Sequence, residues 1–185
     1  MIFVFVFVST FLIDQGIKHW VVDRAYEIHQ KQATHTSTNI PEAALVGTIL
    51  STGKYINLEL YLNKGVAFSM FSFFGSYMKW IQGALVLFLL FIVFKENYIQ
   101  HYAVPAGLLM GGALGNVYDR FIHEGVVDYI FWHYGFNYPV FNYADVAIDV
   151  AFVMIVILLL RAKRVKYHDE NCCFLRFIGA FIFVW

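Results

Sequence analysis

Two aspartates stand at the start of a long apolar run late in the sequence. The segment FNYADVAID carries Asp145 and Asp149 four residues apart, and it continues directly into VAFVMIVILLL. A carboxylate in apolar surroundings costs several kilocalories per mole unless it is paired, hydrogen-bonded or neutralised. We therefore expect these positions either to be paired or to do chemistry.

A third aspartate, Asp128, follows an apolar lead-in in the same way, as VVD. Two carboxylates held close together cannot both ionise easily, so one pKa rises and the pair shares a proton. Such a dyad activates water with one member and protonates a leaving group with the other. A proton or cation relay in a transporter fits the same residues equally well. From the residues alone, a dyad of Asp128 and Asp145 and a relay stand as alternatives.

Other catalytic patterns do not occur in the chain. His123 and Glu124 lack the H-E-x-x-H arrangement of a zinc helix, and no serine lies in a nucleophile elbow. The two cysteines are adjacent, at Cys172 and Cys173, which is neither a disulfide framework nor a zinc spacing. We expect no metal and no cofactor.

The composition indicates lipid as the solvent of much of this chain. Of 185 residues, 60% are hydrophobic and 14% charged, whereas soluble domains have about 45–50% apolar and about 25% charged residues. The net charge of zero suggests no nucleic-acid partner. We expect one membrane-embedded domain over residues 1–166. The apolar tail at 167–185 is too short to span and is predicted to lie at the membrane interface.

Four segments approach the roughly 20 helical residues that cross a bilayer: 2–22, 76–94, 102–122 and 141–160. The predicted fold is an all-α integral membrane protein with four transmembrane helices. Arg161, Lys163, Arg164 and Lys166 follow the fourth segment, so that end is predicted to be cytoplasmic. Both termini are then cytoplasmic, and residues 23–75 and 123–140 lie outside.

The long outer segment divides by pattern. Residues 23–54 are polar and mixed, which predicts an irregular or partly helical outer-face insertion. Residues 55–62, YINLELYL, alternate like a strand and precede a turn signal at 63–65. AFSMFSFFG is apolar but too short to span, which indicates a segment lying on the membrane surface. We expect 55–74 to form a small β-cradle at the outer face.

With this topology, nearly every polar group within the spans falls in the outer leaflet. Intramembrane ionisable residues usually face a bundle interior or a wet cavity and mark function. The residues concerned are Asp14, Lys18, Asn116, Asp119, Arg120, Asn142, Asp145 and Asp149. A transmembrane relay predicts ionisable groups at several depths instead.

Simpler structural roles compete for most of these residues. Asp14 and Lys18, at i and i+4, form either a structural ion pair or a substrate contact. Asp119 and Arg120 either snorkel or pair at the interface, and Asn142 is a preferred helix N-cap residue. Gly107, Gly111 and Gly115 repeat the GxxxG spacing, which permits close helix packing and brings Asn116 and Arg120 towards a neighbouring helix.

Five blocks of residues together resemble the lipoprotein signal peptidases, or signal peptidase II. They are D-x-x-x-K (Asp14, Lys18), N-x-G-x-A-F (Asn63, Gly65, Ala67, Phe68), GGALGNVYDR (111–120), GVVDY (125–129) and FNYAD (141–145). Their order and approximate spacing match over roughly residues 8–160. Val66 and Tyr129 depart from the alanine and phenylalanine that are common in the family, and Asp149 lies outside its motifs.

The resemblance implies an aspartyl protease of the bacterial cytoplasmic membrane, with an outer-face β-cradle. We expect a monomer, because the dyad is complete within one chain. Such an enzyme removes signal peptides from prolipoproteins, just before a diacylglyceryl-modified cysteine in the membrane lipid, and is blocked by globomycin. The family pattern implies that Asp128 and Asp145 are catalytic. Residues that line, brace or surround the site are Asp14, Lys18, Asn63, Gly65, Phe68, Asn116, Asp119, Arg120 and Asn142. A binding or chaperone module that keeps the fold without activity remains a further alternative.

Overall fold

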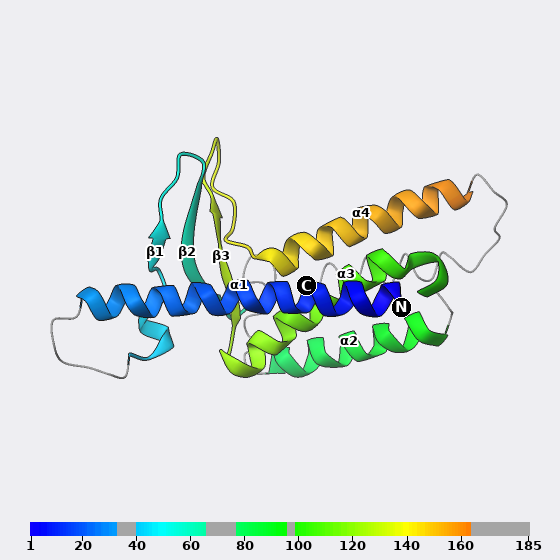
Figure 1. Cartoon of the computed structure of the whole chain (residues 1–185), viewed down its shortest axis with the longest axis horizontal. Coiled ribbons are helices and arrows are strands. Elements are labelled where there is room, and N and C mark those ends of the chain that lie inside the picture. The colour runs from blue at the N-terminus through cyan, green and yellow to red at the C-terminus, as the bar shows by residue number, and fades with distance from the viewer. Residues whose placement is uncertain (33–39, 66–76, 96–98, 164–185) are drawn as a thin grey trace.

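The computed structural model describes residues 1–32, 40–65, 77–95 and 99–163, in which long helices lie beside a small sheet (Figure 1). The helices are α1 (Ile2–Gln32), η1 (Glu42–Ala44), α2 (Met78–Lys95), α3 (Ile99–Ile122) and α4 (Tyr143–Lys163). The strands are β1 (Ile49–Ser51), β2 (Ile56–Asn63) and β3 (Val126–Trp132), which form an antiparallel sheet in that order. The described chain is therefore mostly helical, as predicted.

Helix α3 is the centre of the bundle and packs against α1, α2 and α4. Its glycines allow a very close approach to α1. A Cβ at Gly111 would lie 2.7 Å from the carbonyl oxygen of Phe7, and one at Gly115 would lie 2.3 Å from Oδ2 of Asp14. The predicted packing role of the GxxxG face is confirmed, because any larger side chain would separate the two helices.

The sheet rests on the C-terminal half of α1, beyond the helix bundle (Figure 1). Val21 and Ala25 of α1 are fully buried in one apolar cluster with Leu60 of β2 and Val127 of β3. Burying these side chains fixes the sheet on the helix through the hydrophobic effect. The sheet register pairs Tyr61 of β2 with Asp128 of β3, which places Asp128 close to the bundle.

Two expectations about the outer segments were wrong in part. The helix of the first predicted span continues beyond residue 22 to Gln32 because its outer turns pack on the sheet, which agrees with the partly helical start expected for the insertion. Residues 49–51, within the predicted irregular insertion, form β1, and residues 126–132, predicted as a loop, form β3. The predicted strand at 55–62 is confirmed to within one residue.

Two helices, over Ile2–Lys31 and Met78–Lys95, meet the length and hydropathy expected of a membrane span among the described residues. The four-span arrangement therefore stays a prediction for α3 and α4. The surface segment expected at 67–75, including Phe68, and the interfacial tail expected at 167–185 lie outside the described residues.

Candidate active site

The N-terminus of α4 is closed by a reciprocal pair of hydrogen bonds. Oδ1 of Asn142 accepts from the backbone N–H of Asp145 at 3.0 Å, and Oδ2 of Asp145 accepts from the backbone N–H of Asn142 at 3.0 Å. This is a capping box, in which an N-cap side chain and the third helical residue satisfy each other's donors. The predicted capping role of Asn142 is confirmed, and the Asp145 carboxylate is held in one orientation.

The two backbone N–H groups between Asn142 and Asp145 donate to side chains of other elements. Tyr129 of β3 accepts from the N–H of Tyr143 through its hydroxyl at 3.2 Å, and Oδ1 of Asp14 in α1 accepts from the N–H of Ala144 at 3.1 Å. The first N–H groups of a helix have no partner within the helix. Here they tie α4 to β3 and α1, so these two elements position the start of α4.

Asn142 also binds the second carboxylate. Its Nδ2 donates to Oδ1 of Asp128 at 2.7 Å, while its backbone N–H donates to Asp145. Asp128 is 2% exposed and Asp145 is half-buried. One residue thus holds the carboxylates of β3 and α4 side by side, as the dyad hypothesis requires.

Asn116 of α3 links this pair to the helix bundle. Its Nδ2 donates to Oδ1 of Asp145 at 2.9 Å. Its Oδ1 accepts from Nδ2 of Asn142 at 3.2 Å and from Nζ of Lys18 at 2.8 Å. The orientation of the Asn116 amide is therefore determined at both ends, and so is the position of Asp145.

Lys18 lies at the centre of a buried ion network. Its Nζ is 2.8 Å from Oδ2 of Asp14 and 2.8 Å from Oδ2 of Asp119, and the three side chains are 0–2% exposed. Buried charges are tolerated when they are paired and fully hydrogen-bonded. The predicted ion pair of Asp14 with Lys18 is confirmed, and Asp119 of α3 completes it.

Gln15 was not predicted, yet it closes the same network. Its Nε2 donates to Oδ1 of Asp119 at 2.9 Å, to Oδ2 of Asp14 at 3.2 Å and to the carbonyl oxygen of Gly115 at 3.3 Å. Asp119 also accepts from the N–H of Val127 at 3.1 Å, which fixes the start of β3 against α3. Gln15 is a polar residue next to Asp14 within an apolar run, and this feature of the sequence could have identified it as part of the network.

Arg120 does not snorkel. It is 6% exposed, and its guanidinium donates to the carbonyl oxygen of Gly65 at 2.9 Å and to that of Asn116 at 3.2 Å. Asn63 accepts from the N–H of Gly65 at 3.0 Å. The snorkelling account is wrong because α3 faces the end of β2 here, and the guanidinium holds that end instead of reaching the interface.

The surroundings of Asp128 favour its neutral form. Burial raises the pKa of this carboxyl well above its usual range, and the nearby charge of Asp145 raises it further. Hydrogen bonds from Asn63 and Asn142 oppose the rise but do not cancel it. Burial likewise raises the pKa of the Tyr129 hydroxyl. The site therefore suits one protonated and one ionised carboxyl, which is the combination that general acid–base catalysis needs.

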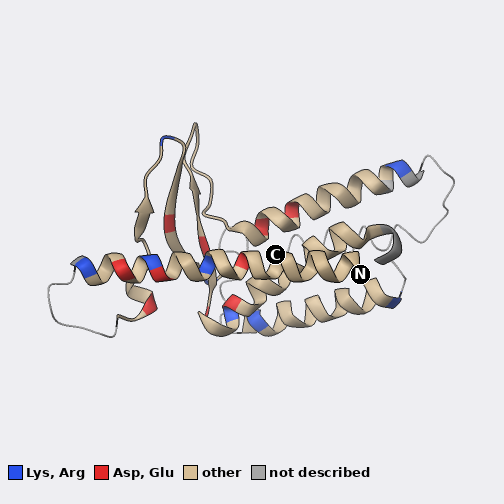
Figure 2. Ribbon diagram, in the orientation of Figure 1, with Lys and Arg blue, Asp and Glu red and all other residues tan. Residues whose placement is uncertain are grey.

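Charged side chains of the described residues gather at one end of the bundle, around the sheet and the start of α4 (Figure 2). The far halves of the helices are largely uncharged up to their ends (Figure 2). Asp149, which lies outside the family motifs, is exposed on α4. Among the described residues, no group of three His, Cys, Asp or Glu side chains is arranged to hold a metal ion.

Comparison with known proteins shows which proteins this chain is similar to. Residues 6–161 match the family Signal peptidase (SPase) II. A lipoprotein signal peptidase of Sulfurovum sp. (strain NBC37-1) is 46% identical over 85% of this chain and 92% of its own length. One from Helicobacter pylori (strain P12) is 36% identical over 92% of both chains. A solved structure described as a bacterial membrane enzyme superposes with a TM-score of 0.67 at 24% identity, over 91% of this chain and 93% of its own.

Proposed function

Because this chain belongs to the signal peptidase II family, we propose that it is an intramembrane aspartyl endopeptidase of the bacterial cytoplasmic membrane. It removes signal peptides from diacylglyceryl-modified prolipoproteins by cleaving just before the lipidated cysteine. Asp128 and Asp145 are its catalytic pair. The observation that carries this proposal is that Asn142 donates to both carboxylates.

The proposed reaction needs no covalent intermediate. The ionised carboxylate takes a proton from a water molecule, whose oxygen attacks the carbonyl carbon before the cysteine. The protonated carboxyl donates to the developing oxyanion, and a proton then goes to the departing amine as the C–N bond breaks. The two carboxyls share one proton between them.

Hydrogen bonding suggests how the proton is distributed at rest. Asp145 accepts N–H donors at both oxygens, from Asn116 and from the backbone of Asn142, which favours its carboxylate form. Burial favours the neutral form of Asp128. We infer that Asp145 is the resting base and Asp128 the resting acid.

The proposed topology places this chemistry where the substrate is. α1 to α4 cross the membrane with both termini in the cytoplasm, and the charged end of the bundle lies at the outer face (Figure 2). The lipid chains of the substrate cysteine then remain in the outer leaflet, with its scissile bond near the membrane surface. The sheet acts as the cradle, and Asn63 at the end of β2 contacts the lipopeptide, with Phe68 as a further contact.

The proposal is tested with the full-length chain in proteoliposomes and a diacylglyceryl-modified prolipoprotein. Asp128→Asn and Asp145→Asn each abolish cleavage, whereas Asp149→Asn, one turn further along the same helix, keeps it. Globomycin inhibits the wild-type chain, and an unlipidated precursor is a poor substrate. Cleavage at the wild-type rate by either of the first two variants would disprove the dyad, and equal cleavage without the lipid would disprove the substrate class.

A further inference from the structure

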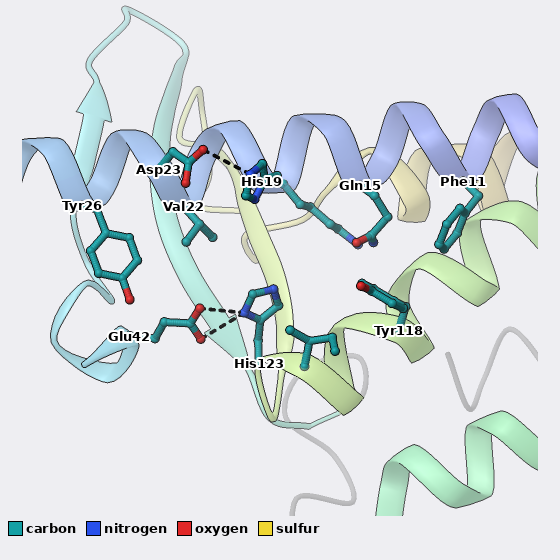
Figure 3. Close-up of a pocket in the computed structure, with 11 residues that line it drawn as sticks. Phe11, Gln15, His19, Val22, Asp23, Tyr26, Glu42, Tyr118 and His123 are labelled. Atoms are coloured by element: carbon teal, nitrogen blue, oxygen red, sulfur yellow. Dashed lines mark hydrogen bonds and ion pairs between the residues drawn. The ribbon is translucent and has the colours of Figure 1, made fainter. Parts of the chain in front are cut away.

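A hollow lies apart from the two proposed catalytic aspartates. It has a volume of about 540 Å³ and opens between α1, the η1 turn and the C-terminal end of α3 (Figure 3). Neither Asp128 nor Asp145 lines it. Gln15 and Lys18, which do line it, are engaged with Asp14 and Asp119. The hollow therefore borders the buried ion network and does not contain the two proposed catalytic carboxyls.

The lining of the hollow changes from apolar to charged along α1. At one end the rings of Phe11 and Tyr118 meet edge to face, with centroids 5.9 Å apart. Towards the other end lie Asp23 and Glu42, with Tyr26 beyond them (Figure 3). Phe11 and Asp23 are separated by about 18 Å along the helix axis at the usual rise per residue. This gradient fits an amphiphile with its polar group at the Asp23 end.

The charged end is not positive. Nε2 of His19 lies 3.4 Å from Oδ2 of Asp23. Across the hollow, Nδ1 of His123 lies 2.8 Å from Oε1 of Glu42 (Figure 3). Whether each imidazole is neutral or protonated, the two pairs together carry negative or zero charge, and the ammonium of Lys18 is offset by Asp14 and Asp119. Whenever either imidazole is neutral the wall is negative, and it then attracts a cation and disfavours an anion.

The carboxylates are also accessible to a ligand. Asp23 is 58% and Glu42 33% exposed at the side chain, so each carboxylate is open to a cation in the hollow. Tyr26 adds an aromatic ring near the two carboxylates (Figure 3), and ring faces attract ammonium groups. In the proposed topology the Phe11 end lies deeper in the membrane than the Asp23 end, as a phospholipid of the outer leaflet would require.

We propose that this hollow binds an aminophospholipid of the outer leaflet. Its ammonium group lies between Asp23 and Glu42, and the first part of its acyl chains lies along Phe11 and Tyr118. The site holds a resident lipid on the side of α1 and α3 away from the cleaved peptide bond. The proposal goes beyond the peptidase function, and its test does not require cleavage activity.

The test is native mass spectrometry of the full-length chain released from detergent micelles. The micelles contain equal amounts of phosphatidylethanolamine and phosphatidylglycerol with the same acyl chains, so the comparison isolates the ammonium. We expect about a tenfold excess of the phosphatidylethanolamine adduct, since two partly exposed charge pairs together contribute about one factor of ten. Asp23→Asn combined with Glu42→Gln should bring the two adducts to equal abundance.

Further variants and one further ligand distinguish this outcome from misfolding and from binding of the headgroup alone. Asp23→Lys should favour phosphatidylglycerol instead, because an ammonium at this position attracts the anionic headgroup. Glu27→Gln, at an exposed carboxylate of α1 that does not line the hollow, should keep the wild-type preference. Equal adducts in the wild-type chain, or an unchanged preference in the double variant, would overturn the proposal. So would binding of soluble phosphoethanolamine as tight as that of the lipid.

Discussion

Nδ2 of Asn142 donates a hydrogen bond of 2.7 Å to Oδ1 of Asp128. The same residue caps α4 and receives its own cap from Asp145. A helix terminus and a pair of carboxyls are thus organised by one residue, through its side chain and its backbone N–H. The start of α4 and the geometry of the site cannot change independently, and this coupling leads to the first prediction.

Asn142→Asp should separate capping from catalysis. Aspartate caps helices about as well as asparagine, so α4 should keep its start, although a third carboxyl at this fully buried position should lower the unfolding temperature in detergent. The new side chain cannot donate an amide hydrogen to Asp128, and it adds a third carboxyl to the pair. We expect cleavage of the lipidated precursor to fall by at least about a hundredfold, as for loss of general acid–base catalysis. Activity within a few-fold of the wild type would show that this hydrogen bond is not needed.

Lys18→Met should mainly affect stability. It leaves the buried carboxylates of Asp14 and Asp119 without their cation. Removing one partner of a buried ion pair costs about 3–5 kcal/mol. We expect a corresponding loss in the free energy of unfolding, measured by denaturant titration in mixed micelles. Lys54→Met, at an exposed lysine of the described sheet region, should cost little, and equal losses in both variants would contradict the role of the network.

Gly115→Ala should separate α1 from α3. The added Cβ would meet Oδ2 of Asp14 at 2.3 Å, so either the helices move apart or the Asp14–Lys18 pair is displaced. Overpacking of this kind costs about 1–3 kcal/mol. Gly16→Ala is the matched control, because a Cβ at Gly16 meets nothing within 4 Å and alanine favours the helix. Thermal unfolding of the two variants should shift in opposite directions, and a stable Gly115→Ala protein would refute the predicted clash.

The stability of the protein should depend on the ionisation of Asp128. Its pKa in the folded protein is raised above its ordinary value of 3.8, so the folded state binds a proton more tightly than the unfolded state does. The resulting stability is complete below about pH 4 and is lost as the pH rises through the folded pKa. Asp128→Asn mimics the neutral form and should unfold at a higher temperature than the wild type at pH 7.

The difference between Asp128→Asn and the wild type should shrink as the pH is lowered towards about 4. Unfolding temperatures measured at a series of pH values check this directly. Glu27→Gln removes an exposed carboxylate and should follow the wild-type curve throughout. A gap between Asp128→Asn and the wild type that is independent of pH would show that the carboxyl does not titrate in this range.

Local features of the sequence were enough for much of the helical framework and for several of the buried polar residues. Apolar runs predicted α1, α2, α3 and α4 to within a few residues, apart from the outer end of α1. The alternation of YINLELYL predicted β2, since strand side chains alternate between faces. Polar residues in apolar runs identified Asp14, Lys18 and Asn116, because such residues are costly unless they are used.

Other features depended on contacts between distant segments. β3 was missed because its sequence, VVDYIFW, does not alternate and becomes a strand only through pairing with β2. Gln15 and Tyr129 were missed because their partners lie far along the chain, at Asp119 and at Tyr143.

The sequence by itself determined which residues carry charge within apolar segments, and at which end of each helix they lie, because hydropathy and helical rise are local properties. Only the tertiary structure decided which of them meet. Asn142 lies between Asp128 and Asp145, and Lys18 lies between Asp14 and Asp119, because α3 packs closely on α1 and β3 returns to the start of α4. Such pairings depend on the packing of whole elements, which no local pattern records.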